Sequence, residues 1–491
     1  MPFGAACLLA FLSAFLLYLA FPHPHISGFV WVAALPFYLA CRFQGPVRGA
    51  VLGLLFGCAF QYSLLSWATV FGTAAQVALV LYKAVAPALL GALLGSYRPP
   101  TPLHGALFGA AAWVGMEYFQ ILGPLGMTWG MLSHTQSRIL PWIQIGELFG
   151  PWGLSFAIAF WNAALAELFW RRKRALTTVG AAAGLLAVIF SYGIVRLQHP
   201  WGNGHSLTWG VVQTSMPQDQ RWDPSFREEI MGRLDRLTRE SASQGARLIL
   251  WPETSVPYPF FLETWPLRSR VGGLAQSLQS FILTGSIERA SEPNATRNVA
   301  TLVAPDGELL ATAEKIRLVP FGEYLPLPRF MRDWPIFDRV MRYVPGTQHV
   351  IFPDPTSFGV LICYESMVPH EPRKKVERGA GVLAVITNDA WFGKSSAAMH
   401  HFEMAIMRAV EMRRPVVQCG NNGISGFILP TGEVMVESGL DEVVQLTREV
   451  RPETYRTIYS RTGDLLAYLC LAMMLWLIRL QLGERTQCVK S

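Results

Sequence analysis

Long apolar stretches with few charges dominate the first 196 residues and limit what the chain can fold into. A helix needs about 20 apolar residues to cross the roughly 30 Å hydrocarbon core of a bilayer. Eight stretches approach this length: 3–20, 27–41, 49–70, 73–96, 103–122, 152–170, 176–196 and 464–481. We therefore predict a bundle of about eight transmembrane helices, of which the second is short and is either tilted or paired with the first as a hairpin. The first stretch is interpreted as an uncleaved helix and not as a signal peptide, because no basic segment precedes it and further apolar stretches follow directly.

The chain changes character after these stretches. From about 197 to 461 polar and apolar residues alternate as they do in water-soluble domains. Over the whole chain only 15% of residues are charged, against about 25% in typical soluble proteins. The sequence therefore predicts three parts: transmembrane helices in 1–196, a water-facing domain in 197–461, and a last transmembrane helix with a tail in 462–491.

Basic residues near the ends of the predicted helices set the orientation of the chain, because Arg and Lys accumulate on the cytoplasmic side of a membrane. With the N-terminus in the cytoplasm, the densest basic cluster, 171–174, lies inside, together with Arg42, Arg48, Arg98, Arg485 and Lys490. The region 197–463 then lies outside, which is the periplasm in a cell with two membranes. The net charge of +7 follows this topology and is spread too thinly for a nucleic-acid interface.

Two ionisable residues fall inside predicted spans, Lys83 near the middle of one and Glu117 near the outer end of another. Ionisable residues within a membrane are functional candidates by default. The alternative for Lys83 is a polar seam between helices or snorkelling toward water. The alternative for Glu117 is local capping and pairing. We favour the structural alternative for both residues.

The polar region has the alternation typical of a layered α/β domain. Strand-like runs are found at 207–213, 247–253, 281–287, 358–365, 381–389, 415–421 and 424–430, and helix-like runs at 225–243 and 396–414. Of the seven cysteines, only Cys363 and Cys419 fall in this region. Both lie in runs that are typical of a buried core, so we do not expect a disulfide between them.

Three short stretches of the polar region each place an ionisable residue that suits nucleophilic catalysis at the end of a hydrophobic strand. Glu253 ends one run, Lys315 lies in a second with Glu323 eight residues later, and Cys363 ends a third with Glu365 two residues later. Strand ends of α/β domains are where catalytic groups collect. A carboxylate can take the proton of a thiol, and an ammonium group can stabilise the oxyanion that forms when the thiolate attacks a carbonyl. Each residue alone is more often a core or solvated residue, so the prediction of a thioester-forming site depends on their combination.

Four motifs, WPETSVPY, EKIRLVPFGEYLP, ICYES and TNDAWFG, together resemble the carbon–nitrogen hydrolase (nitrilase) superfamily. With the flanking apolar helices and the segment GELFGPWGLSFAIAFWNA at 146–163, the chain resembles the membrane branch of that superfamily, the apolipoprotein N-acyltransferases. The resemblance covers nearly the whole chain and is strongest over about 207–440. It implies an αββα sandwich set on eight membrane helices.

The resemblance also implies a role for several residues. By their places in the motifs, Glu253 corresponds to the general base, Lys315 to the oxyanion stabiliser and Cys363 to the nucleophile. Glu323 resembles a supporting glutamate that lies beside the lysine and the cysteine in the family. Neither a metal ion nor another cofactor is implied.

Other positions match the family less directly. Tyr364 and Glu365 follow the nucleophile as in the family, and the backbone N–H after the nucleophile is a natural oxyanion donor. Trp222 matches a tryptophan on a mobile loop near the lipid entrance, or alternatively packs only on its own loop. Lys394 stands where an acidic residue is common, and His400-His401 where a Gln-His pair is frequent. Adjacent histidines on a helix point to different sides, so we do not expect them to bind a metal.

The resemblance implies a two-step acyl transfer in the bacterial inner membrane. A fatty acyl chain passes from a phospholipid to the cysteine thiol, and then to the α-amine of the N-terminal diacylglyceryl-cysteine of an apolipoprotein. The expected partners are these two substrates and the bilayer, and the enzyme is expected to be a monomer. The aromatic stretches 258–267 and 329–344 would either dip into the outer leaflet or pack on the domain. Two alternatives stay open: a membrane-anchored amidase or nitrilase that passes the acyl group to water, and a transporter or scaffold with an inactive domain.

Overall fold

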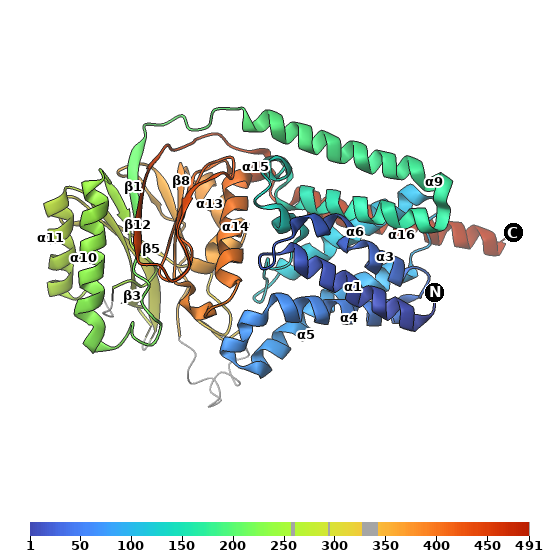
Figure 1. Cartoon of the computed structure of the whole chain (residues 1–491), viewed down its shortest axis with the longest axis horizontal. Helices are drawn as coiled ribbons and strands as arrows, with labels where there is room; N and C mark the ends of the chain where they lie inside the picture. Colours follow the sequence, from blue (N-terminus) through green and yellow to red (C-terminus); the bar gives the residue numbers. More distant parts are fainter. Residues whose placement is uncertain (257–260, 293–294, 327–341, 491) are drawn as a thin grey trace. The chain divides into compact units, whose positions relative to one another are not determined.

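The computed structural model describes residues 1–256, 261–292, 295–326 and 342–490 (Figure 1). Most of the aromatic stretch 329–344 and the start of the stretch 258–267 lie outside these residues. The described chain divides into two compact units. The helical unit comprises 1–199, 394–400 and 462–491, and the sheet unit comprises 200–393 and 401–461.

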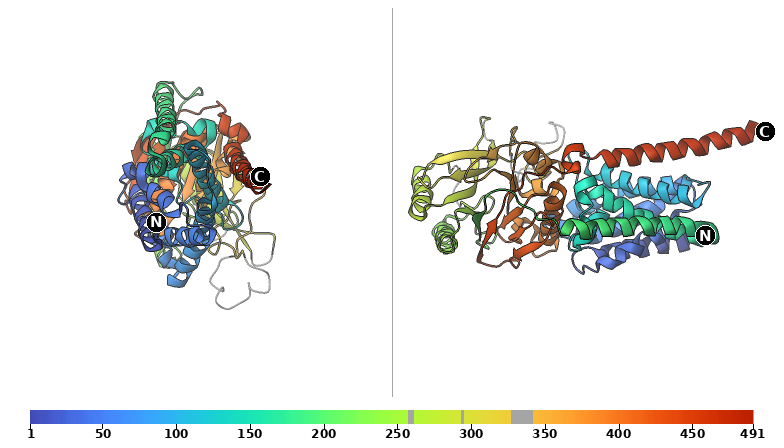
Figure 2. Two further views of the ribbon diagram at one scale, coloured as in Figure 1. Left: turned by 90° about the vertical axis from the view of Figure 1, so that its right-hand side faces the viewer. Right: turned by 90° about the horizontal axis from the view of Figure 1, so that it is seen from above.

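The helical unit is built from long apolar helices. They are α1 (Phe3–Ala20), α4 (Pro46–Leu64), α5 (Thr73–Ser96), α6 (Pro102–Ile121), α9 (Pro151–Leu197) and α16 (Leu465–Lys490). Shorter helical turns connect them: η1 (Ser27–Phe29), α2 (Val30–Ala33), α3 (Leu35–Cys41), η2 (Ser66–Phe71), η3 (Leu132–Gln136), α7 (Leu140–Ile143) and α8 (Gly146–Phe149). Figures 1 and 2 show α1, α4 and α5, in blue, lying side by side.

Five helices in the described part of the chain are long and apolar enough to cross a membrane: α1, α4, α5, α9 and Leu465–Gly483 of α16. Helix α9 contains both predicted spans 152–170 and 176–196, and it kinks between them where Arg171 and Arg172 leave helical backbone angles. The predicted second span corresponds to a shorter apolar helix at Ser27–Cys41. The stretch 103–122 forms α6, which does not belong to the group of five. The helices therefore establish several apolar spans but not the predicted number of eight.

Glycines allow the backbones of α4 and α5 to approach closely. A Cβ atom on Gly53 would lie 2.0 Å from the carbonyl oxygen of Pro87, and one on Gly49 would lie 2.2 Å from that of Gly91. Side chains of any size are therefore excluded along this contact. Small residues at helix interfaces are typical of membrane bundles, where close van der Waals packing replaces the hydrophobic effect.

The sheet unit contains two six-stranded sheets, with strand orders β12-β1-β2-β3-β4-β5 and β11-β10-β9-β8-β7-β6. In each sheet three consecutive strands are parallel, β1-β2-β3 and β7-β8-β9, and the other pairs are antiparallel. The strands of the first sheet are β1 (Leu207–Gln213), β2 (Leu248–Leu250), β3 (Phe281–Arg289), β4 (Thr296–Val303), β5 (Leu309–Glu314) and β12 (Val444–Val450). Those of the second are β6 (Ile351–Phe352), β7 (Phe358–Ile362), β8 (Val382–Thr387), β9 (Val416–Gly420), β10 (Gly426–Ile428) and β11 (Val434–Glu437).

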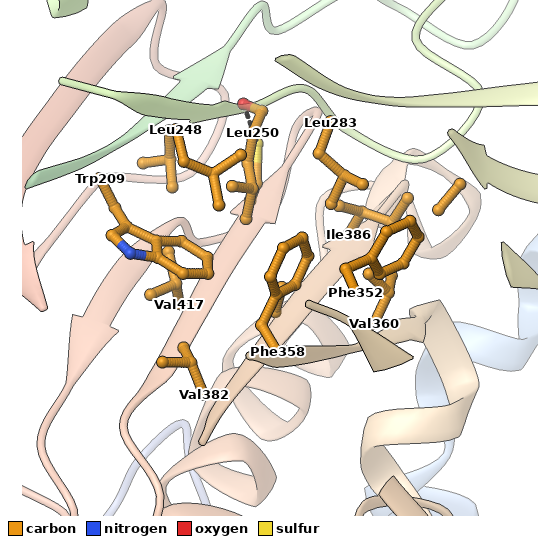
Figure 3. Packing of buried hydrophobic residues seen from close by; sticks show 14 of the residues in the cluster. Trp209, Leu248, Leu250, Leu283, Phe352, Phe358, Val360, Val382, Ile386 and Val417 are labelled. Carbon is orange, nitrogen blue, oxygen red and sulfur yellow. Dashed lines mark hydrogen bonds between the residues drawn. The ribbon is translucent and has the colours of Figure 1, made fainter. Parts of the chain in front are cut away.

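Apolar side chains from both sheets meet to form the core of this unit (Figure 3). Trp209 and Leu250 of the first sheet and Phe358 and Ile386 of the second are all buried in this cluster. On the outer face of the first sheet lie α10 (Arg227–Ser243) and α11 (Trp265–Leu278), and on that of the second lie α13 (His370–Glu377) and α14 (Ala397–Met412) (Figure 1). The predicted α/β domain is thus confirmed, as a four-layered sandwich. The remaining turns are η4 (Pro224–Phe226), η6 (Cys363–Met367), η7 (Asp389–Phe392) and α15 (Ile458–Thr462).

Candidate active site

The three residues predicted to act together each come directly after a strand or shortly beyond it. Glu253 follows β2, Lys315 follows β5, and Cys363 follows β7 as the first residue of η6. A fourth residue, Asn388, follows β8 in the same way. The rigid sheets therefore fix the backbone from which these side chains project, as is usual for catalytic groups of α/β domains.

Lys315 lies between two carboxylates. Its Nζ is 3.1 Å from Oε1 of Glu253 and 2.7 Å from Oε1 of Glu323. The lysine side chain is only 1% exposed, so both ion pairs are shielded from water. Burial lowers the pKa of Lys315, but the charges of Glu253 and Glu323 outweigh burial and raise the pKa well above its usual value. The side chain is therefore held as an ammonium group.

Hydrogen bonds fix the orientation of both carboxylates. The side-chain amide of Asn298 donates to Oε1 of Glu253 over 2.7 Å and to Oε1 of Glu323 over 3.4 Å. The second oxygen of Glu253 accepts from the backbone N–H of Asn388 over 2.9 Å, and that of Glu323 accepts from the N–H of Val319 over 2.7 Å. Glu253 is thus held rigidly, as a general base must be.

Cys363 occupies a backbone conformation that only a tightly held turn maintains. Its φ angle is +53°, in the left-handed region that a residue with a side chain rarely adopts. The carboxylate of Glu365 holds the turn, because it accepts from the N–H of Ile362 over 2.7 Å. The same carboxylate accepts from the N–H of Ile316 over 2.7 Å and of Arg317 over 3.1 Å. Glu365 therefore ties the turn of Cys363 to the segment that begins with Lys315.

The thiol of Cys363 is protonated in this environment. Burial raises its pKa well above the usual value, the charge of Glu253 raises it further, and the charge of Lys315 acts in the opposite direction. Both charges therefore lie near enough to act on the sulfur. Because the thiol does not ionise by itself near neutral pH, it needs a base at the moment of attack. The arrangement suits proton transfer from the sulfur to a carboxylate, followed by attack on a carbonyl whose oxygen is stabilised by an ammonium group.

Similarity to known proteins extends over both units. Residues 210–459 match the carbon-nitrogen hydrolase family, and residues 13–164 match the apolipoprotein N-acyltransferase N-terminal domain. The chain is 35% identical to an apolipoprotein N-acyltransferase of Geobacter metallireducens, over 95% of this chain and 93% of the relative. It is 30% identical to one of Gloeobacter violaceus, over 93% and 90%.

The chain belongs to the apolipoprotein N-acyltransferase family. It is an acyltransferase enzyme whose second unit is a carbon–nitrogen hydrolase domain. Among solved structures it is similar to an amidase from Nesterenkonia sp., with 21% identity and a TM-score of 0.41, over 55% of this chain and 99% of that chain.

Two other residues, Tyr364 and Trp222, were predicted from the resemblance to N-acyltransferases. Tyr364 is buried and directly follows Cys363. Trp222 is partly buried, and the guanidinium of Arg221 lies 5.9 Å from the centre of its ring. Arg221 itself donates to the carbonyl oxygen of Glu253 and, over 3.1 Å, to that of Thr254. The loop that carries Trp222 is therefore anchored to the backbone of the proposed base.

Three residues of this candidate site were not predicted from the sequence: Asn298, Asn388 and Arg221. Asn298 acts through its side chain but lies within β4, where nothing in the local pattern distinguishes it from a surface position. Asn388 contributes its backbone N–H, which carries no sequence signal. Arg221 directly precedes the predicted Trp222, but its burial and its hydrogen bonds to the backbone of Glu253 and Thr254 depend on the fold. Burial lowers its pKa to about 10.

The two ionisable residues of the helical unit are bound locally. Nζ of Lys83 donates to the carbonyl oxygen of Met127 over 3.1 Å. Glu117 accepts from the N–H of Leu132 over 2.8 Å and from the indole of Trp113 over 3.2 Å. Both side chains therefore hold the segment between α6 and α9, which agrees with the structural alternative. In the sheet unit, Cys363 and Cys419 are both free thiols.

Proposed function

We propose that this chain transfers a fatty acyl group from a membrane phospholipid to the N-terminal diacylglyceryl-cysteine of apolipoproteins, through a thioester on Cys363. The observation that carries the proposal is the buried contact of Lys315 with Glu253 and Glu323 beside a thiol in a strained turn. Such a centre can form and resolve an acyl-enzyme without a metal ion or a cofactor. The names of the relatives supply the class of acceptor.

In the first proposed step, Glu253 takes the proton of the Cys363 thiol as the sulfur attacks the ester carbonyl of the phospholipid. The ammonium group of Lys315 and the backbone N–H of Tyr364 stabilise the negative oxygen that develops. The carbon–oxygen bond of the ester then breaks. Glu253 returns the proton to the departing alkoxide, which leaves as a lysophospholipid, and the acyl group remains on the sulfur.

In the second proposed step, the α-amine of the acceptor cysteine attacks the thioester. Glu253 removes a proton from the attacking nitrogen, and the same two donors stabilise the oxygen again. The carbon–sulfur bond breaks as the amide forms, and Glu253 delivers the proton to the sulfur. Glu323 keeps Lys315 in place through both steps. Three further residues either support the site or bind the substrates: Tyr364, Glu365 and Trp222.

The proposed setting is the bacterial inner membrane. We propose eight membrane spans in 1–196 and 462–491, with the catalytic domain of 197–461 in the periplasm and the enzyme acting as a monomer. The basic residues that flank the apolar segments support this orientation. Both substrates are anchored in lipid, which explains why a hydrolase-type domain is joined to a set of apolar helices.

A reconstituted transfer assay tests the proposed function. The full chain is placed in phospholipid vesicles with a synthetic diacylglyceryl lipopeptide, and products are measured by mass spectrometry. The expected product is the lipopeptide with one additional acyl chain on its α-amine, together with lysophospholipid. Release of free fatty acid with no acylated peptide would instead favour a hydrolase that passes the acyl group to water.

A further inference from the structure

A second group of polar side chains lies buried behind Cys363. Its members come from four elements: Ser366 in η6, Thr387 at the end of β8, Asp389 in η7 and His401 in α14. None of the four is more than 2% exposed. Buried polar groups of this kind are costly unless they bond to one another, and these four do.

The four side chains form a continuous chain of hydrogen bonds. Oγ of Ser366 lies 2.6 Å from Nε2 of His401, and Nδ1 of His401 lies 2.9 Å from Oδ1 of Asp389. Oγ1 of Thr387 donates to the same oxygen of Asp389 over 2.9 Å. The order serine, histidine, aspartate is that of a hydrolytic triad. Here, however, Ser366 is fully buried, so no substrate reaches its oxygen.

Both ends of this series of hydrogen-bonded side chains lie next to Cys363. At one end Oγ of Ser366 donates to the carbonyl oxygen of Cys363 over 2.9 Å. At the other end the side chain of Thr387 lies near enough to the thiol of Cys363 to lower its pKa. The four side chains therefore form a ring with Cys363: Ser366 bonds to its backbone carbonyl, and Thr387 lies beside its thiol.

The count of hydrogens shows what His401 contributes. A serine hydroxyl has a single hydrogen, and in Ser366 it points to the carbonyl of Cys363. The short contact between Ser366 and Nε2 of His401 is then a hydrogen bond only if Nε2 donates. Because Nδ1 faces the carboxylate of Asp389, the ring must then carry a hydrogen on both nitrogens. If Ser366 instead turned its hydrogen to the histidine, the carbonyl of Cys363 would lose this donor. The presence of a hydrogen on Nε2 of His401 therefore determines whether Ser366 donates to the carbonyl oxygen of Cys363 or to Nε2.

We propose that Asp389 and His401 are positioning residues for Cys363, acting through Ser366 on its backbone carbonyl. The proposal rests on the proposed function, because it takes Cys363 as the nucleophile. A left-handed backbone angle at a residue with a side chain costs about 1–3 kcal/mol and persists only where its surroundings over-determine it. Glu365 fixes the residue before Cys363, and this ring fixes Cys363 itself.

The position of Asp389 is restricted from the opposite side. A Cβ atom on Gly423 would lie 2.1 Å from Oδ2 of Asp389, so only glycine leaves room for the carboxylate there. Within the described residues, Oδ2 has no hydrogen-bond partner. An added methyl group at Gly423 would therefore push the carboxylate away from His401 and Thr387 without altering any member of the ring.

The segment from Thr387 to Asp389 serves both catalytic groups. Its middle residue, Asn388, donates its backbone N–H to Glu253, while its neighbours hold Cys363 through the ring. A shift of this segment would therefore displace the base and the nucleophile together. A buried ring that does not contact the substrate would therefore change the rate of acyl-enzyme formation.

The test measures the rate of acyl-enzyme formation, with the full chain in vesicles of a single phospholipid and intact mass as the readout. Ser366→Ala, His401→Phe and Gly423→Ala are each expected to slow this rate about 100-fold at saturating phospholipid, with KM changed less than about twofold. His401→Gln, whose amide can still donate to Ser366, is expected to recover much of the rate. His400→Gln, at the adjacent residue outside the ring, is the control and is expected to react normally.

Wild-type rates in both Ser366→Ala and His401→Phe would overturn the proposal, as would a rise in KM with an unchanged maximal rate. Where His401→Phe does not fold, Ser366→Ala decides alone, because it removes one oxygen and almost no volume. Cys363→Ala separates this result from the proposed function: an adduct that still forms there refutes the nucleophile, whatever the ring variants do.

Discussion

Glu253 and Lys315 are 62 residues apart in the chain and form a direct buried ion pair of 3.1 Å. The proposed base and the proposed oxyanion stabiliser therefore share one contact. Glu323 holds the lysine from its other side over 2.7 Å, so that the ammonium group stays in place when Glu253 accepts a proton. A site of this kind is preorganised: its charges are in position before the substrate arrives.

Replacement of Glu253 by glutamine tests its role as the base. Glutamine keeps the size of the side chain and an oxygen that can accept from Asn388, but it cannot take a proton. We expect acyl-enzyme formation to slow by about 10²–10⁴-fold. Glu229→Gln, on the exposed surface of α10, is the matched control and should react at the normal rate. Nearly full activity in Glu253→Gln would assign the base to another group.

Asn298 is expected to matter for both stability and activity, because its amide bonds to two buried carboxylates. Asn298→Ala removes one donor from each of these buried carboxylates, which costs about 1–3 kcal/mol of unfolding free energy. Asn203→Ala removes an exposed side-chain hydrogen bond and should change stability by less than about 0.5 kcal/mol. Chemical unfolding of the two variants measures both losses of unfolding free energy. Equal losses would show that the amide of Asn298 does little at the site.

The carboxylate of Glu365 is expected to be needed for the turn of Cys363. Glu365→Gln replaces one acceptor oxygen by an NH2 group. That donor then faces a backbone N–H that has lost its acceptor, either the N–H of Ile362 or those of Ile316 and Arg317. We expect a loss of about 1–3 kcal/mol in stability, together with slower alkylation and acylation of Cys363. Peptide mapping after reaction with iodoacetamide measures the alkylation. A variant as stable and as reactive as the parent would contradict this role.

The raised pKa of the Cys363 thiol predicts how its reactivity depends on pH. A thiol in an unfolded chain ionises around pH 8.5, so its alkylation rate levels off above that pH. In the folded enzyme burial and the charge of Glu253 oppose ionisation, and the rate should therefore continue to rise well above pH 9. Mass spectrometry of the peptide that contains residue 363 follows the rate, with the urea-unfolded chain as reference. A plateau near neutral pH in the folded enzyme would mean that the thiolate is already present.

The sequence predicted what depends on local pattern. Apolar stretches predicted most of the long helices, and alternating runs predicted the layered α/β domain with α10 and α14 close to their observed bounds. The ends of strand-like runs pointed to Glu253 and Cys363 because catalytic groups collect there. Local pattern could not predict the number of spans. The stretch 27–41 is divided among short helices, and two predicted spans form one kinked helix, α9.

The contacts that complete the site depend on tertiary structure. Asn298 meets Glu253 across strands of the first sheet, and His401 meets Ser366 from a helix 35 residues further along the chain. No spacing in the sequence encodes such pairs. Asn388 acts through its backbone, so the identity of its side chain carries no information about that hydrogen bond. The sequence predicted the class of reaction better than the contacts within the site, because whole motifs resemble those of a known family.

The most direct test of the account is the intact mass of the enzyme purified from membranes. A fraction of the protein is expected to be heavier by one fatty acyl group, with the added mass on Cys363 and removed by hydroxylamine at neutral pH. Cys363→Ala should lack it, while Cys419→Ala should carry it. An acyl adduct that resists hydroxylamine, or one that persists in Cys363→Ala, would contradict the central claim that Cys363 carries the acyl group as a thioester.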